Sequence, residues 1–187
     1  MCKKILLSAL LTVTTVLNVS AQKFSPSPDF LKGEKQINLI FDYSQVKYKN
    51  DSQEELYKNK GRKWVEEWEG ARRDYNANSF ISNINDELKR INLNAGEYIE
   101  AQYTLIVEVL DCDFSVYAGP VTIPAKLKCD VKIVKTSTNE LLTSISLKVA
   151  QNPNSVTGTP VDFDRMYLAF GEMGEEVGKK LVKALYR

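Results

Sequence analysis

Two aspartates in one predicted strand are the first candidates for chemistry. Asp111 and Asp113 lie two residues apart, so they share one face of an extended strand. Such a pair could act as acid and base in glycoside cleavage, or bind calcium through hard oxygen ligands. The alternative, which we favour, is an exposed sheet face on which charges of adjacent strands pair. The hairpin register described below sets Asp111 opposite Asp130 and Asp113 opposite Lys128.

Glu108 lies on the other face of the same strand, among apolar neighbours. If it were buried, its pKa would rise and it could act as an acid. The favoured interpretation is a solvated strand face, or a bulge that turns the side chain outward. A hydrolase that uses carboxylates and no histidine, with Asp111, Asp113 or Glu108 as its catalytic groups, is one functional hypothesis.

Three aromatic residues could bind a ligand. Trp64, Trp68 and Tyr75 follow one another at intervals of four and seven residues, so they lie on one side of a helix. Aromatic rings on an exposed helix face stack on sugar rings or small molecules, which gives a glycan-binding or small-molecule-binding hypothesis. The same spacing is typical of a helix face that packs on a sheet, and we favour this interpretation.

Two cysteines lie in neighbouring predicted strands. If the chain turns at residues 119–122, Cys112 and Cys129 face each other, within disulfide reach if they form a close pair. The alternative is two small buried thiols, and a one-residue slip would move Cys129 to the other face. Because the chain contains no histidine, neither thiol has a histidine base, and neither is a strong candidate nucleophile.

The composition excludes several functional classes. The 187 residues are 43% hydrophobic and 26% charged, with a formal net charge of +1, which is typical of a globular protein. This near-neutral charge argues against nucleic-acid binding, and acidic neighbours offset the lysines of residues 126–132 and the pair Arg72–Arg73. With no histidine, a Ser-His-Asp triad or a histidine-ligated zinc site cannot form within this chain. We expect no catalytic residues, no metal and no cofactor.

Residues 1–21 have the pattern of a secretory signal peptide. Lys3 and Lys4 precede an apolar run, and Val19–Ala21 resembles a small-residue cleavage site, so we expect the mature chain to begin at Gln22. The alternative is a buried N-terminal helix. Cys2 precedes the apolar run and leaves with the signal. No other stretch is long and apolar enough to cross a membrane, so the protein is expected to be periplasmic or secreted.

The rest of the chain is expected to form one domain, residues 37–187, after an extended lead segment, residues 22–36. Phe24, Phe30 and Leu31 are candidates to pin the lead segment. Periodicity predicts a strand at 37–43, a helical stripe at 64–75, strands at 101–114, 125–133 and 141–150, and a helix at 164–185. It also predicts a second helical stripe at 80–91, with Ser79 or Asn78 as its N-terminal cap. A capping box at Ser52–Glu55 could open a further helix.

Two features of these elements carry packing predictions. The strand at 101–114 is apolar on both faces, which suggests coverage on both sides. Gly171, Gly174 and Gly178 interrupt the last helix at intervals of three and four residues, which predicts close approach of another backbone. The element order is therefore β-α-β-β-β-α, and the fold class is α+β: a mixed, mainly antiparallel four-stranded sheet packed against helices.

This order resembles the N-terminal domain of TolB and related envelope domains of the curli-channel (CsgG-like) kind. The resembling segments are the helix Phe80–Leu88, the strand segment Ala101–Val107, the strand ending at Val131–Ile133 with its turn into Leu141–Leu142, and the glycine-containing last helix. The resemblance implies a partner-binding module in the envelope of a Gram-negative bacterium, and it brings no catalytic residues.

The sequence thus favours an exported, non-catalytic binding module whose partner is another envelope protein. Such a module should present an exposed apolar patch or an open sheet edge. The glycan or small-molecule binder and the carboxylate hydrolase remain the alternatives.

Overall fold

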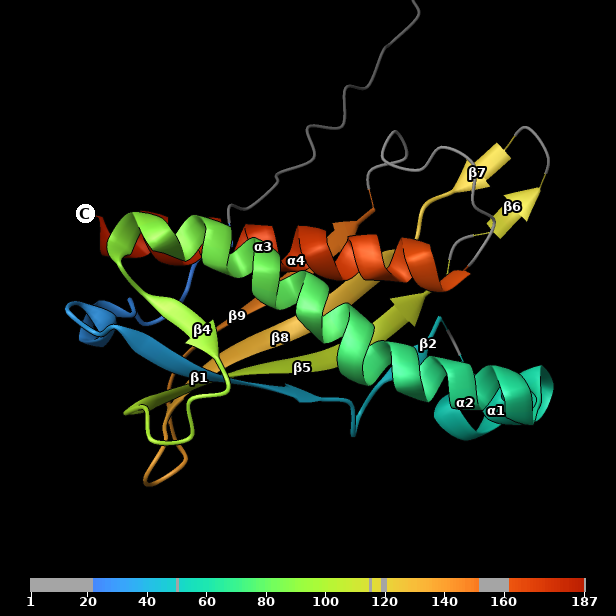
Figure 1. The fold of residues 1–187 in the computed structure, drawn as a ribbon, viewed down its shortest axis with the longest axis horizontal. Coiled ribbons are helices and arrows are strands. Elements are labelled where there is room, and N and C mark those ends of the chain that lie inside the picture. Colours follow the sequence, from blue (N-terminus) through green and yellow to red (C-terminus); the bar gives the residue numbers. More distant parts are fainter. Residues whose placement is uncertain (1–21, 50, 115, 119–120, 152–161, 187) are drawn as a thin grey trace, which may run out of the picture.

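Four long strands build the sheet of the computed structural model, which describes residues 22–49, 51–114, 116–118, 121–151 and 162–186. These strands are β1 (Gln36–Asp42), β5 (Tyr103–Asp113), β8 (Lys126–Lys135) and β9 (Glu140–Ala150). β1 is parallel to β5, and β5, β8 and β9 form an antiparallel meander (Figure 1). The α+β fold class and the mixed, mainly antiparallel sheet are confirmed.

Five short strands were not predicted. β2 (Lys47–Tyr48), β3 (Asp51–Ser52) and β4 (Asn94–Gly96) extend the main sheet to seven strands, and β6 (Val116–Ala118) pairs with β7 (Val121–Ile123) in a separate ribbon. Segments of two or three residues are too short to show a period of two in sequence. Val121 and Thr122 therefore belong to a strand, and the turn predicted at residues 119–122 is wrong in that half. Gly119 and Pro120 lie outside the described residues.

The helices are α1 (Gln53–Lys60), α2 (Arg62–Gly70), α3 (Ala77–Leu88) and α4 (Asp162–Leu185), with short helical turns η1 (Asp29–Leu31) and η3 (Lys89–Ile91). The predicted capping box is confirmed, because the Ser52 hydroxyl accepts from the Glu55 amide while the Glu55 carboxylate accepts from the Ser52 amide. A cap at Asn78 or Ser79 is wrong, because the π-helix η2 (Ala71–Asn76) connects α2 to α3 without a break.

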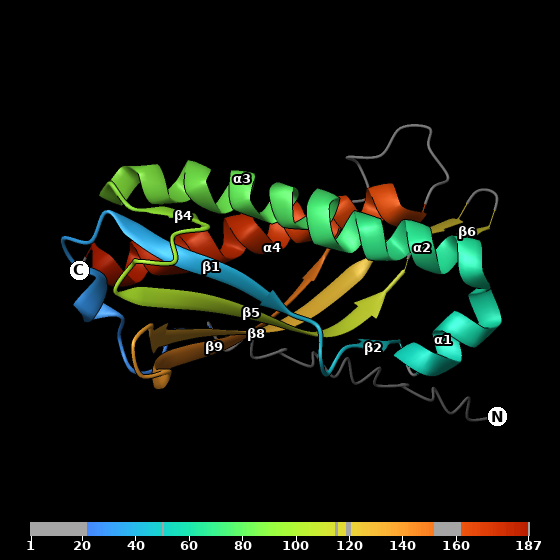
Figure 2. The same ribbon diagram turned by 60° about the horizontal axis from the view of Figure 1, so that its bottom comes forward.

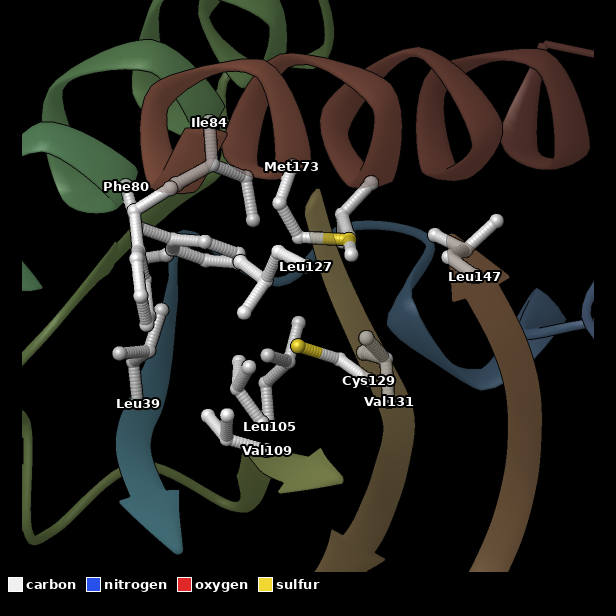
Figure 3. Packing of buried hydrophobic residues seen from close by; sticks show 14 of the residues in the cluster. Leu39, Phe80, Ile84, Leu105, Val109, Leu127, Cys129, Val131, Leu147 and Met173 are labelled. Carbon is white, nitrogen blue, oxygen red and sulfur yellow. The ribbon is translucent and has the colours of Figure 1, made fainter. Parts of the chain in front are cut away.

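Helices α3 and α4 cover one face of the sheet (Figure 2). On β5, Leu105, Val107 and Val109 are fully buried beneath them, in the core drawn in Figure 3. The opposite face is not covered to the same extent: Ile106 on β5 is half-buried, and Ile40 on β1 is 45% exposed. Coverage of β5 on both faces, predicted from its apolar composition, is therefore wrong.

Helices α3 and α4 pack closely through the three glycines. Successive contacts run in the same direction along both helices, with Gly171 beside Ser79 and Gly178 beside Ile84 and Glu87, so the helices are parallel. A Cβ at Gly171 would lie 2.8 Å from the Ser79 hydroxyl, and one at Gly174 would collide with the Phe80 carbonyl oxygen. The close approach predicted from the glycine spacing is confirmed.

The lead segment lies against the domain as predicted. Phe24 and Leu31 are buried, and the Phe30 ring lies 4.9 Å from that of Tyr103, between centroids. Ser25 exchanges two backbone hydrogen bonds with Ser144 of β9. Residues 1–21, predicted to be a signal peptide, and residues 152–161 lie outside the described residues. None of the helices in the described part of the chain has the length and apolar character needed to cross a membrane.

Candidate functional site

Trp68 is a core residue. Its side chain is fully buried, and its indole Nε1 donates a hydrogen bond of 2.9 Å to the Tyr48 hydroxyl. The rings of Phe114 and Phe163 lie 5.0 and 5.8 Å from the Trp68 ring, between centroids. These partners come from β2, the end of β5 and the start of α4, so the indole joins three parts of the fold. A buried ring of this kind cannot stack on a ligand from solvent.

The other two predicted aromatic residues lie in different surroundings. Trp64 is half-buried, with its ring 5.5 Å from Phe114 and 5.4 Å from Phe163, between centroids. Tyr75 is 50% exposed, and its ring lies tilted against that of Tyr167 of α4 at a centroid distance of 4.3 Å. The structure therefore does not bring Trp64, Trp68 and Tyr75 onto one accessible surface. The π-helix contributes to this separation, because Tyr75 lies within it and the predicted α-helical spacing does not hold there.

Asp111 and Asp113 lie opposite lysines. The register pairs Asp111 with Lys128 and Asp113 with Lys126, so the predicted pairs with Asp130 and Lys128 are wrong. Burial raises the pKa of Asp111, while a 2.9 Å hydrogen bond from the Lys49 amide acts in the opposite direction. This arrangement is the cross-strand charge pairing that the sequence favoured.

Glu108 lies on the less covered face of the sheet and forms an ion pair. Its carboxylate is 2.5 Å from Lys132 Nζ, and its side chain is 17% exposed. In the next strand, Asp42 is its register partner, and hydrogen bonds from the Ser44 amide and hydroxyl lower the pKa of Asp42. Among the described residues, no group of three acidic or cysteine side chains could hold a metal ion.

The two cysteines are buried and are not joined by a disulfide. The register pairs Cys112 with Leu127 and Cys129 with Val109, so the predicted direct opposition of the two cysteines is wrong. The cause is the position of the turn, since β6 and β7 pair two residues short of the predicted register and the Cys112–Leu127 pair continues the β6–β7 register. A bulge between Val109 and Asp111 separately changes the strand parity and turns Cys112 toward the helices.

We expect both thiols to resist alkylation in the native protein. Burial raises the pKa of the Cys129 thiol well above its usual value, and the thiolate is the reactive form. A maleimide reagent at pH 8 should modify both native cysteines only after denaturation. In the Ser146→Cys variant, the introduced exposed thiol should be labelled at least about 100-fold faster than either native thiol. Mass spectrometry measures both rates. Rapid native labelling, or a Cys112–Cys129 disulfide in the purified protein, would contradict this expectation.

The outer edge of β9 is the accessible feature that remains. β9 pairs with β8 on one side, and on its other side the described residues contribute only the bridge between Ser25 and Ser144. Ser146, Lys148 and Ala150 are exposed. Beside them a groove of about 380 Å³ separates the edge from α4. Its lining residues are Gln22, Leu147, Lys148, Val149, Ala150, Glu172, Glu175, Glu176, Lys179 and Lys180.

The α4 wall of this groove carries both signs of charge. Glu175 pairs with Lys179, and Glu176 lies 3.1 Å from Lys180 Nζ. The hydrogen bond to Glu175 raises the pKa of Lys179. Glu172 makes no ion pair with another described residue. The sequence predicted an open edge in general terms, but not the groove, because β9 and α4 are brought together only by the folded sheet.

The fold and the groove define the class: a two-layer α+β protein in which one outer strand edge lies beside a helix and, within the described residues, is paired only at Ser144. No family model matches the sequence, and no curated protein matches it.

Solved structures with a similar arrangement include the PelC dodecamer from Paraburkholderia phytofirmans, with 9% identity, a TM-score of 0.44 and coverage of 83% of this chain and 96% of that one. A minor lipoprotein from Acinetobacter baumannii has 10% identity, a TM-score of 0.42 and coverage of 80% and 91%. Protein XCC0632 from Xanthomonas campestris has 19% identity, a TM-score of 0.38 and coverage of 58% and 63%. At TM-scores below 0.5 these likenesses support no inference about function, and they do not show the resemblance to TolB.

Proposed function

We propose that this chain is an exported, non-catalytic protein of the cell envelope that binds another protein. The observation that carries the proposal is the outer edge of β9, which no described residue beyond Ser25 pairs with and which exposes Ser146, Lys148 and Ala150 beside the groove. A strand edge presents unpaired backbone N–H and C=O groups that can form hydrogen bonds with a strand of another chain. Proteins usually shorten or cover such edges, so an 11-residue edge strand beside a groove favours a binding role.

The surroundings of the other candidate residues support this proposal over the enzyme hypothesis. The Glu108 carboxylate is paired with Lys132, and the Asp111 carboxylate accepts from the Lys49 amide. Trp68 packs in the core. The proposal of export rests on the signal pattern of residues 1–21, with the mature chain beginning at Gln22.

A position-specific cross-link in living cells tests this function. A photoreactive amino acid at Lys148, on the edge of β9, should form an adduct with one protein of the envelope fraction. The same amino acid at Lys63, which is exposed on α2, is the control and should not give that adduct. Equal adducts at both positions, no adduct at Lys148, or retention of the protein in the cytoplasm would overturn the proposal.

Glycan binding is the second candidate, and it now rests on Tyr75. The ring is half exposed and lies tilted against Tyr167, so part of its surface is accessible to a sugar. Tyr75→Ala should abolish any binding of the protein to a glycan array, while Tyr186→Ala, at another exposed tyrosine, should leave it unchanged. Absence of glycan binding by the wild-type protein would remove this candidate.

A further inference from the structure

The peptide groups on the outer edge of β9 follow a fixed alternation. Both the amide and the carbonyl of Ser144 bond outward to Ser25. From Ser144 to Ala150 the register with β8 is continuous, without a bulge. Because the direction of peptide groups alternates along a strand, those of Ser146, Lys148 and Ala150 also point outward. Residues Ile145, Leu147 and Val149 direct theirs toward β8.

The lead segment already pairs with this edge at one position. The Ser25 amide donates to the Ser144 carbonyl at 3.1 Å, and the Ser144 amide donates back at 3.4 Å, in antiparallel orientation. Within the described residues the lead segment makes no other backbone hydrogen bond to β9. The outward N–H and C=O groups of Ser146, Lys148 and Ala150 therefore lie along the same strand edge that Ser25 pairs with at Ser144.

The groove determines which side chains an added strand would need. Leu147 and Val149 are on the helix side of β9, so alternate side chains of an added strand would also point toward α4. There they would meet Glu172, whose carboxylate has no ion-pair partner among the described residues. The groove lining as a whole carries three glutamates and three lysines, counting Lys148 on β9. Glu175 and Glu176 are paired with lysines of α4, so it is Glu172 that favours a positive side chain at this position.

We propose that the groove between β9 and α4 binds an extended segment of another protein, added as an antiparallel strand along Ser146–Ala150, with a lysine or arginine directed at Glu172. This inference rests on the proposed function and names the form of its partner. Lys148 disfavours a second copy of β9 as the occupant, because two copies paired about this residue would bring like charges together.

Synthetic peptides test the strand directly with the mature protein. The probe is a six-residue peptide of alternating lysine and valine, capped at both ends, followed by NMR at the amides of Ser146 and Lys148. We expect saturable shifts at these amides and binding about tenfold tighter than that of a glutamate–valine peptide. N-methylation of alternate residues, which blocks strand pairing, should abolish the shifts.

Two variants separate the two parts of the interaction. Lys148→Pro removes one outward N–H and should weaken binding about tenfold, and an edge strand tolerates proline where the N–H faces solvent. Glu172→Lys should weaken binding of the lysine peptide about fivefold and strengthen that of the glutamate peptide. Glu97→Lys, an exposed charge reversal next to β4, is the control and should change neither. Circular dichroism checks the fold of each variant.

The outcomes distinguish this inference from the proposed function. If the peptides do not bind, or bind equally to the wild type and to Lys148→Pro, strand addition is refuted, while the cross-link at Lys148 can still stand. If the peptides bind as expected but the cross-link is missing in cells, the groove is a strand site and the proposed envelope function is refuted.

Discussion

Replacement of Trp68 by alanine should lower the free energy of unfolding by about 3–5 kcal/mol, the range found for large aromatic residues removed from a packed core. The indole is fully buried, and its loss would leave a cavity among the rings of Phe114, Phe163 and Tyr48. It would also leave the Tyr48 hydroxyl without the donor that now lies 2.9 Å away. Denaturant unfolding followed by circular dichroism measures the change.

Trp68→Phe is the matched variant for this prediction. It keeps an aromatic ring and removes the indole N–H, so we expect a smaller loss, of about 1–2 kcal/mol. Trp64→Phe, at the half-buried neighbour, should cost less than either change at Trp68. A loss below about 1 kcal/mol for Trp68→Ala would contradict a core role and would favour a ring that is retained for ligand binding.

Replacement of Gly174 by alanine should destabilise the protein by about 2–3 kcal/mol. A Cβ at this position would lie inside van der Waals contact with the Phe80 carbonyl oxygen and 3.0 Å from the Phe80 carbonyl carbon. These atoms are backbone and cannot rotate away, so α3 and α4 must separate. The loss exceeds the gain in helix propensity from glycine to alanine, which is about 1 kcal/mol.

Gly70→Ala is the control for the glycine prediction. Gly70 ends α2, and a Cβ there would meet no atom within 4 Å. Because no steric clash opposes it, the higher helix propensity of alanine should stabilise the protein by about 0.5–1 kcal/mol. If both glycine variants were stabilised alike, the close packing of α3 on α4 would be wrong.

Local patterns predicted the elements well where one face of the element is buried. Alternation along residues 125–133 and 141–150 identified β8 and β9, because the helices cover one side of these strands. The glycine spacing in α4 predicted its close contact with α3. The capping box at Ser52 was readable because it involves residues only three positions apart.

Properties that depend on pairing between distant residues were predicted poorly. The bulge between Val109 and Asp111 has no strong sequence signal, yet it decides which way Cys112 points, while the position of the turn decides which charge faces Asp111. The π-helix likewise moved Tyr75 away from the stripe of Trp64 and Trp68. The groove beside β9 needs Leu147 and Glu172 together, and their proximity follows only from the folded sheet.

Amide hydrogen exchange along β9, measured by NMR in the mature protein without a partner, tests most directly whether the outer strand edge is free. We predict alternation: slow exchange at Ile145, Leu147 and Val149, whose amides face β8, and fast exchange at Ser146, Lys148 and Ala150. Slow exchange at all six amides would show that another part of the molecule already occupies the edge, and would contradict both the open binding site and the role assigned to this protein.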